Sequence, residues 1–147
     1  ALDGAAYEYF GNSVGIFDDT VIIGASGDDN FRGSAYLFVR KNGVWTQQAK
    51  LTAPDGNAHD QFGKSVGIFR DTVIVGAPGD DDKGLHSGSV YLFALKEDVW
   101  IHQAQLTAPD GNAGDQFGRN VSIFGDTVIV GAFGSDSGSA QVFTLDN

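Results

Sequence analysis

Acidic side chains recur in two sets of glycine-rich loops, and carboxylate oxygens are the ligands that Ca²⁺ takes in proteins. One set lies in loops of variable length and is the candidate ligand-binding set: Asp28, Asp29, Asn30, Asp80, Asp81, Asp82, His86 and Asp136. The candidate metal ligands are drawn from both sets: Asp55, Asp60, Asp80, Asp82, Asp110 and Asp115. The alternative is that these carboxylates accept hydrogen bonds from N–H groups in turns. Recurrence of Asp55 and Asp110 at equivalent positions favours that structural role for these two.

Residues that could act as nucleophiles or general bases do not form a catalytic pattern. Ser13 and Ser65 stand in G-x-S-x-G sequences, but a hydrolase elbow needs the serine on a strand-to-helix turn, and here it enters a strand. His59, His86 and His102 occupy non-equivalent positions without metal-ligand spacing. We therefore expect no catalysis.

The loops belong to an internal repeat. Of the 27 positions from Leu51 to Ala77, 22 are identical to the residue 55 positions later. A diverged first copy opens the chain, so the chain divides into copies of about 1–52, 53–107 and 108–147 within one domain. Spacing is constant from each Phe-Gly pair to the next Gly-Ala pair, whereas the segment after Gly-Ala varies in length. Constant spacing indicates paired strands, and variable spacing indicates a surface loop.

Each copy contains a series of short strands. The predicted first strands are Ser13–Phe17, Ser65–Phe69 and Asn120–Phe124, joined by two-residue hairpins to second strands at Thr20–Ala25, Thr72–Ala77 and Thr127–Ala132. The predicted third strands are Ala35–Val39, Val90–Ala94 and Ala140–Thr144, and the fourth are Val44–Leu51 and Val99–Leu106. The total is eleven strands, because the third copy lacks its fourth. One four-stranded antiparallel sheet per repeat predicts an all-β fold of propeller blades, with a prism, a trefoil or a solenoid as alternatives.

The landmarks resemble a known family. Phe62-Gly63 followed at fixed distance by Gly76-Ala77-Pro78 is similar to the FG-GAP repeat of integrin α-subunit propellers and of bacterial and algal surface proteins. The resemblance implies blades around an axis and binding of extracellular ligands. Integrin blades carry a calcium loop between their first two strands, whereas Arg70-Asp71 is too short to wrap an ion, which places this chain with short-hairpin repeats.

The composition of the chain limits the classes of molecule that it could bind. The 147 residues carry a formal net charge of −10 and 41% hydrophobic residues, with 21 glycines and no cysteine. Nucleic acid is excluded as a partner because phosphate contacts need a basic surface. No apolar run is long enough for membrane insertion. Trp45 and Trp100, at equivalent positions, suit either stacking on sugars, as in lectins, or packing between blades, and recurrence favours packing.

Three blades, one of them incomplete, leave apolar flanks uncovered. We therefore expect closure either by a second copy, giving a homodimer of six blades, or by further blades of a parent chain. The expected function is a non-catalytic extracellular module that binds protein or glycan through its variable loops, with Ca²⁺ as the candidate cofactor. The alternative function is a structural propeller segment with no ligand of its own.

Overall fold

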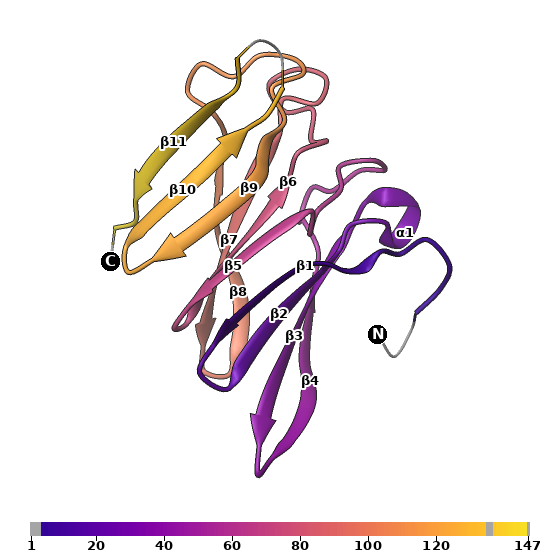
Figure 1. The fold of residues 1–147 in the computed structure, drawn as a ribbon, viewed down its shortest axis with the longest axis vertical. Coiled ribbons are helices and arrows are strands. Elements are labelled where there is room, and N and C mark those ends of the chain that lie inside the picture. The colour runs from indigo at the N-terminus through magenta and orange to yellow at the C-terminus, as the bar shows by residue number, and fades with distance from the viewer. Residues whose placement is uncertain (1–3, 135–136, 147) are drawn as a thin grey trace.

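The computed structural model describes residues 4–134 and 137–146, which form three antiparallel sheets that follow one another along the chain (Figure 1). Blade 1 contains β1 (Phe10–Phe17), β2 (Thr20–Ala25), β3 (Ser34–Lys41) and β4 (Val44–Leu51). Blade 2 contains β5 (Ser65–Phe69), β6 (Thr72–Ala77), β7 (Ser89–Lys96) and β8 (Val99–Leu106). Blade 3 contains β9 (Phe117–Phe124), β10 (Thr127–Ala132) and β11 (Ser139–Thr144). The predicted all-β fold of propeller blades is confirmed, and the described residues form the eleven strands expected.

Strand formation follows from local composition. The second strands are runs of β-branched residues, and β6 is buried along almost its whole length because a sheet packs on each of its faces. Each first strand turns directly into the second, since Phe17 pairs with Thr20 and Phe69 with Thr72. The outer strands β4 and β8 are largely exposed, as their mixture of polar and apolar residues predicts.

The observed boundaries differ from the prediction at a few places. β1 and β9 begin three residues early, at Phe10 and Phe117, because these residues pair with Ala25 and Ala132 beyond a register shift. β3 and β7 also extend to the hairpins that follow them. A single turn, α1 (Asp28–Phe31), occupies the first variable loop, where no helix was expected. Among the described residues, no helix has both the length and the apolar character needed to cross a membrane.

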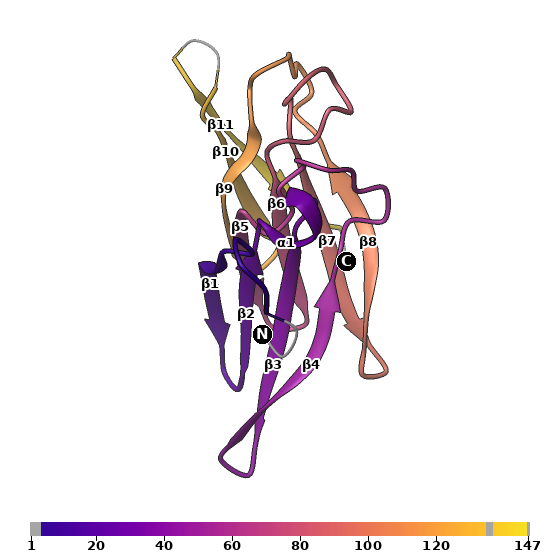
Figure 2. The same ribbon diagram turned by 90° about the vertical axis from the view of Figure 1, so that its right-hand side faces the viewer.

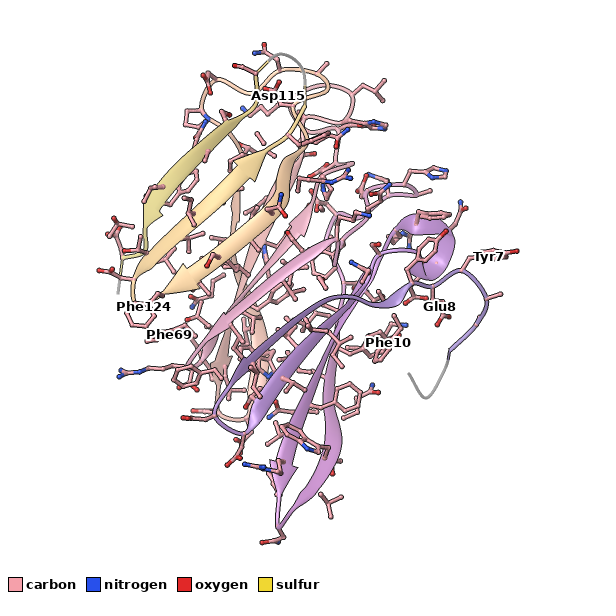
Figure 3. All side chains as sticks on the ribbon, in the orientation of Figure 1. Tyr7, Glu8, Phe10, Phe69, Asp115 and Phe124 are labelled. Carbon is pink, nitrogen blue, oxygen red and sulfur yellow. The ribbon has the colours of Figure 1, made fainter. Side chains whose placement is uncertain are left out.

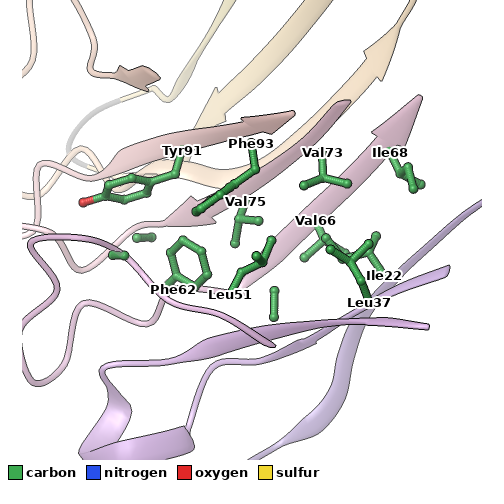
Figure 4. Packing of buried hydrophobic residues seen from close by; sticks show 13 residues of the cluster. Ile22, Leu37, Leu51, Phe62, Val66, Ile68, Val73, Val75, Tyr91 and Phe93 are labelled. Atoms are coloured by element: carbon green, nitrogen blue, oxygen red, sulfur yellow. The ribbon is translucent and has the colours of Figure 1, made fainter. Parts of the chain in front are cut away.

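The blades pack face to face, with blade 2 between the other two (Figures 1 and 2). The core between blades 1 and 2 includes Ile22 and Leu37 from one side and Phe62, Val73 and Phe93 from the other (Figure 4). The core between blades 2 and 3 has the equivalent composition, built around Ile74, Leu92, Phe117, Val128 and Val130. The first strands β1, β5 and β9 contact one another in series.

Adjacent blades touch through backbone at glycine positions. A Cβ atom on Gly24 would lie 2.0 Å from the carbonyl oxygen of Gly63, and a Cβ on Gly76 would lie 2.0 Å from that of Gly118. The same two oxygens accept hydrogen bonds from Ser13 Oγ at 2.9 Å and from Ser65 Oγ at 2.7 Å. The serines of the G-x-S-x-G sequences are therefore inter-blade hydrogen-bond donors, and the Phe-Gly and Gly-Ala landmarks are the two sides of one contact.

Removing the Phe62 ring tests this packing. Phe62 is fully buried between blades 1 and 2, so Phe62→Ala should lower the free energy of unfolding by about 3–5 kcal/mol. Val99→Ala, at an exposed position on β8, is the control and should change it by less than about 0.5 kcal/mol. Urea denaturation followed by tryptophan fluorescence measures both changes. Equal effects of the two substitutions would contradict this description of the core.

Candidate binding site at the loop end of blades 2 and 3

The buried acidic residues of the variable loops bind to their own blades. Asp80 is 3% exposed, and its Oδ2 lies 3.1 Å from the Tyr91 hydroxyl and 3.1 Å from Gln105 Nε2. Gln105 also donates to Asp82 Oδ2 at 2.7 Å, and the Tyr91 hydroxyl lies 2.8 Å from Asp55 Oδ1. The network ties the variable loop and the preceding loop to β7 and β8.

The other blades contain related versions of this network. In blade 1 Asp28 takes the place of Asp80, accepts a hydrogen bond from Ser34 Oγ and lies 2.8 Å from Lys50 Nζ. In blade 3 Gln141 stands where Tyr91 does and donates to Asp110 Oδ1 at 3.2 Å. Each blade has a loop carboxylate that is hydrogen-bonded to its own sheet, although the bonding residues differ. This indicates that the carboxylates hold the loops in place.

Burial changes the titration of this group. Desolvation is the main cause that raises the pKa of Asp80 above its ordinary value of 3.8, and the nearby carboxylates Asp82 and Asp55 add to it. Desolvation likewise raises the pKa of Asp60. Burial and the two neighbouring carboxylates raise the pKa of Tyr91, so its hydroxyl stays protonated and able to donate.

Asp60 and Asp115 close equivalent turns. Asn57 N donates to Asp60 Oδ2 at 2.7 Å, and Asn112 N donates to Asp115 Oδ2 at 2.8 Å. These bonds are the turn-stabilising alternative considered for the metal candidates. Across residues 4–134 and 137–146 no three histidine, aspartate or glutamate side chains form a group that could hold a metal ion. The arrangement gives no support to calcium binding, which stays a prediction.

The exposed members of the ligand-binding set divide between the two loops. Asp29 pairs with Arg32 at 3.2 Å, and the Asn30 carbonyl accepts from His59 N at 3.3 Å. Asp81 Oδ1 accepts from His86 N at 2.7 Å, which folds the second variable loop back on itself. Asp136 lies outside the described residues.

Asp81 and His86 line a hollow of about 510 Å³ between the variable loop of blade 2 and the start of blade 3. Its wall is completed by Ala58, His59, Gln61, Pro78, Gly79, Leu85, Gln116 and Arg119. At the equivalent place between blades 1 and 2, the ring of Phe31 contacts Tyr9 and stacks on His59, with both centroid distances 5.8 Å. At the junction between blades 2 and 3, the residues equivalent to Phe31, Tyr9 and His59 are His86, Gln61 and Gly114. The three contacting rings of the first junction are therefore absent there, and the hollow lies in their place.

Sequence reasoning missed Arg119, Gln116, Gln61 and the role of His59. The available signal was the difference between the second and third copies, because His59 and Gly114 are aligned within a loop, residues 53–63 and 108–118, that is otherwise identical in these two copies. The left-handed backbone of His59, Gln61 and Gln116 recurs at Tyr7 and Tyr9, so it belongs to the repeat and marks no special site. Of the two tryptophans expected to pack between blades, Trp100 does so, and its Nε1 donates to Gln48 Oε1 at 2.9 Å. Trp45 is 43% exposed and lies under the Arg40 guanidinium of its own blade, because none of the described residues forms a blade on that side of blade 1.

The raised pKa of Asp80 predicts a change in the pH dependence of stability. Because the folded-state pKa exceeds the ordinary 3.8, ionising this carboxyl costs the folded state free energy. That cost is absent below pH 3.8, grows as the pH rises to the folded-state pKa, and is constant above it. The unfolding free energy of Asp80→Asn, minus that of the wild type, should therefore increase with pH across this window.

Urea denaturation at a series of pH values between about 3.5 and 8 measures this difference. Asp126→Asn, at the exposed hairpin of blade 3, removes one unit of charge from the chain without touching the network and serves as the control. Parallel pH profiles for Asp80→Asn and the wild type would show that burial does not perturb Asp80.

The sequence comparison agrees with this geometry. The match to the FG-GAP repeat covers residues 1–38, 45–93 and 100–143. The second and third segments each begin in the outer strand of the preceding blade, β4 or β8, and continue into the third strand of the next blade. The inter-blade contact of Phe62-Gly63 with Gly24-Ala25, and of Phe117-Gly118 with Gly76-Ala77, is formed by the residues that give the repeat its name. The chain therefore belongs to the FG-GAP repeat family, whose members are β-propeller interaction modules and are generally not enzymes.

Proposed function

We propose that this chain is an extracellular, non-catalytic binding module that recognises a protein or glycan ligand through its variable loops. The observation that carries the proposal is the hollow that contains Asp81 and His86. Its volume falls within the range of small-ligand sites, about 300–1,000 Å³. FG-GAP repeats are typical of extracellular and cell-surface proteins, which supports the proposed location.

The chemistry of the lining favours a glycan. Asp81 supplies carboxylate acceptors, whereas Arg119 and the two glutamines supply N–H donors, and Leu85 adds an exposed apolar side chain. Arg119 Nη1 donates to Gln116 Oε1 at 3.0 Å, which holds these two side chains together. Adjacent hydroxyl groups of a sugar are matched by such pairs of acceptors and donors. The loops that carry these residues rest on rigid sheets, which is the usual arrangement for recognition.

Binding to a glycan array, with binding constants then measured by calorimetry, tests the proposal. The wild-type protein should bind at least one class of glycan saturably. The double variant Asp81→Asn/His86→Ala should bind about tenfold more weakly or worse, because a hydrogen bond to a charged group contributes about 1.5–3 kcal/mol. The amide oxygen introduced at position 81 can still accept from the backbone N–H of residue 86, so the loop fold is retained.

The matched control is Asp29→Asn, at the position in blade 1 equivalent to Asp81 and outside the hollow. It should bind as the wild type does. Absence of binding across the array, or equal affinity of the double variant, would overturn glycan recognition at this hollow. In the first case a screen against extracellular protein fragments would test the protein alternative.

The second candidate function is a propeller segment whose role is assembly. It is favoured by exposed apolar side chains on the outer flanks of blades 1 and 3, among them Val14, Ile16 and Val142. The two roles are compatible, because the hollow lies in the loops and the apolar side chains lie on the sheets.

A further inference from the structure

The two end blades expose opposite faces that are rich in apolar side chains. On the outer flank of blade 1, which we define by Phe10, Val14 and Ile16, the exposed fractions are 38%, 69% and 68%. On the outer flank of blade 3, defined by Ile129 and Val142, they are 45% and 64%. Apolar side chains gathered in this way mark an interaction surface on a soluble protein.

Both flanks repeat the faces that are buried inside the chain. Phe62, Val66 and Ile68 occupy in blade 2 the positions of the blade 1 flank, and none is more than 8% exposed. Ile74 and Leu92 occupy in blade 2 the positions of the blade 3 flank, and are 0% and 5% exposed. Inside the chain, a face equivalent to the blade 3 flank therefore packs against a face equivalent to the blade 1 flank at each junction.

Blade 3 also has an open space beside the glycine equivalent to those that contact the next blade at the interior junctions. Gly131 is equivalent to Gly24 and Gly76, whose missing Cβ atoms make room for a carbonyl of the next blade. At Gly131 the nearest atom to an added Cβ is 3.6 Å away and belongs to Asn120 of the same blade. A hollow of about 790 Å³ remains there, lined by Asn120, Gly131, Gly138 and Ser139 among others.

The Phe10-Gly11 pair of blade 1 already has the conformation that Phe62-Gly63 and Phe117-Gly118 have where they contact the preceding blade. Gly11 has φ +93°, matching +92° at both Gly63 and Gly118, yet nothing lies within 4 Å of its missing Cβ. The Phe10 ring lies 5.4 Å from Tyr36, as the Phe62 ring lies 5.5 Å from Tyr91. The Phe10-Gly11 pair therefore needs little rearrangement to dock.

A row of aromatic rings at the ends of the first strands also finishes in an exposed ring on blade 3. Phe17 contacts Phe69 at 5.1 Å, and Phe69 contacts Phe124 at 4.9 Å between ring centroids. Phe124 is 78% exposed, and Figure 3 shows it beside Phe69 and far from Phe10, at the other side of the molecule. If a second copy packed on blade 3, its Phe17 would be the next ring in this row and would contact Phe124.

We propose that the blade 3 flank binds the blade 1 flank of a second copy of this chain, with Phe10-Gly11 of that copy seated against Gly131 and Gly138. The occupant is a second copy because its blade 1 offers every group that the interior junctions use. The contact joins different surfaces of the two chains, and two such contacts close a cyclic dimer of six blades.

The first test is the mass in solution by light scattering, over about 1–100 μM protein near 0.15 M salt, where charge repulsion between two acidic chains is screened. The wild type should have twice the mass of one chain at high concentration. Gly131→Ala should raise the dissociation constant at least about tenfold, because a Cβ there would meet a backbone carbonyl of the second copy. Production in the bacterial cytoplasm leaves Asn120, in an N-x-S sequence, free of glycan.

Folding of Gly131→Ala is checked by circular dichroism and should match the wild type, since the added methyl group has space within one chain. A wild-type protein that stays monomeric at all concentrations overturns the proposal, and leaves further repeats of the same polypeptide as occupant. An assembly whose mass Gly131→Ala does not change also overturns it.

A second variant distinguishes the proposed head-to-tail contact from a symmetric one. Ile16→Asp places a charge on the blade 1 flank and should also give monomers, whereas Val44→Asp, equally exposed but at the start of β4, should not. In a mixture of Gly131→Ala and Ile16→Asp, one contact has both flanks intact and the other carries both substitutions. Mixed pairs should therefore be weaker than the wild-type dimer but should form at concentrations where each variant alone is monomeric. Mixed pairs no more stable than those of either variant alone would contradict the head-to-tail geometry.

Discussion

Adjacent blades meet backbone against backbone at one glycine of the second strands β2 and β6, and the contact leaves no room for a Cβ atom. A carbonyl oxygen of one blade occupies the space where Gly24 or Gly76 would carry a side chain. Three features of the repeat follow from this contact. At both interior junctions a glycine stands at that point of the second strand, a phenylalanine fills the gap beside it, and the first strand supplies a hydroxyl donor, Ser13 or Ser65, for the same carbonyl. The equivalent residue of the third copy is Asn120.

The contact also fixes which lengths can change. A one-residue insertion within either strand between Phe62 and Gly76 would turn the following side chains of that strand to the opposite face. It would also shift Gly63 relative to Gly76, whose carbonyl accepts a hydrogen bond from Gly63 N. The loop between the second and third strands bears no such restriction, because Ser34 and Ser89 restore the register after loops of different length. Variation therefore accumulates in this loop, where one copy has Phe31 packed on His59 and the next has His86 beside an open hollow.

Much of the fold could be predicted from the sequence because the repeat shows its own register. All three second strands and both fourth strands were predicted at the observed residues, since each is bounded by two-residue turns or by constant spacing. The early starts at Phe10 and Phe117 were missed because a register shift hides the pairing with Ala25 and Ala132. The site was predicted less well. Sequence places Asp80, Asp81 and Asp82 side by side, but only the fold turns Asp80 inward to Tyr91 and leaves Asp81 at the hollow.

Ligand recognition and assembly use separate parts of the same blade, and this separation has a physical origin. The named flank residues are uncharged, as surfaces that pack against another sheet must be, whereas many acidic residues of a chain with net charge −10 lie in loops and hairpins. Substitution in a loop leaves the glycine contact unchanged, so the hollow can change its lining without altering how blades stack. Gly131 illustrates the converse. Within one chain nothing prevents a side chain there, and the space matters only when another Phe-Gly pair enters it.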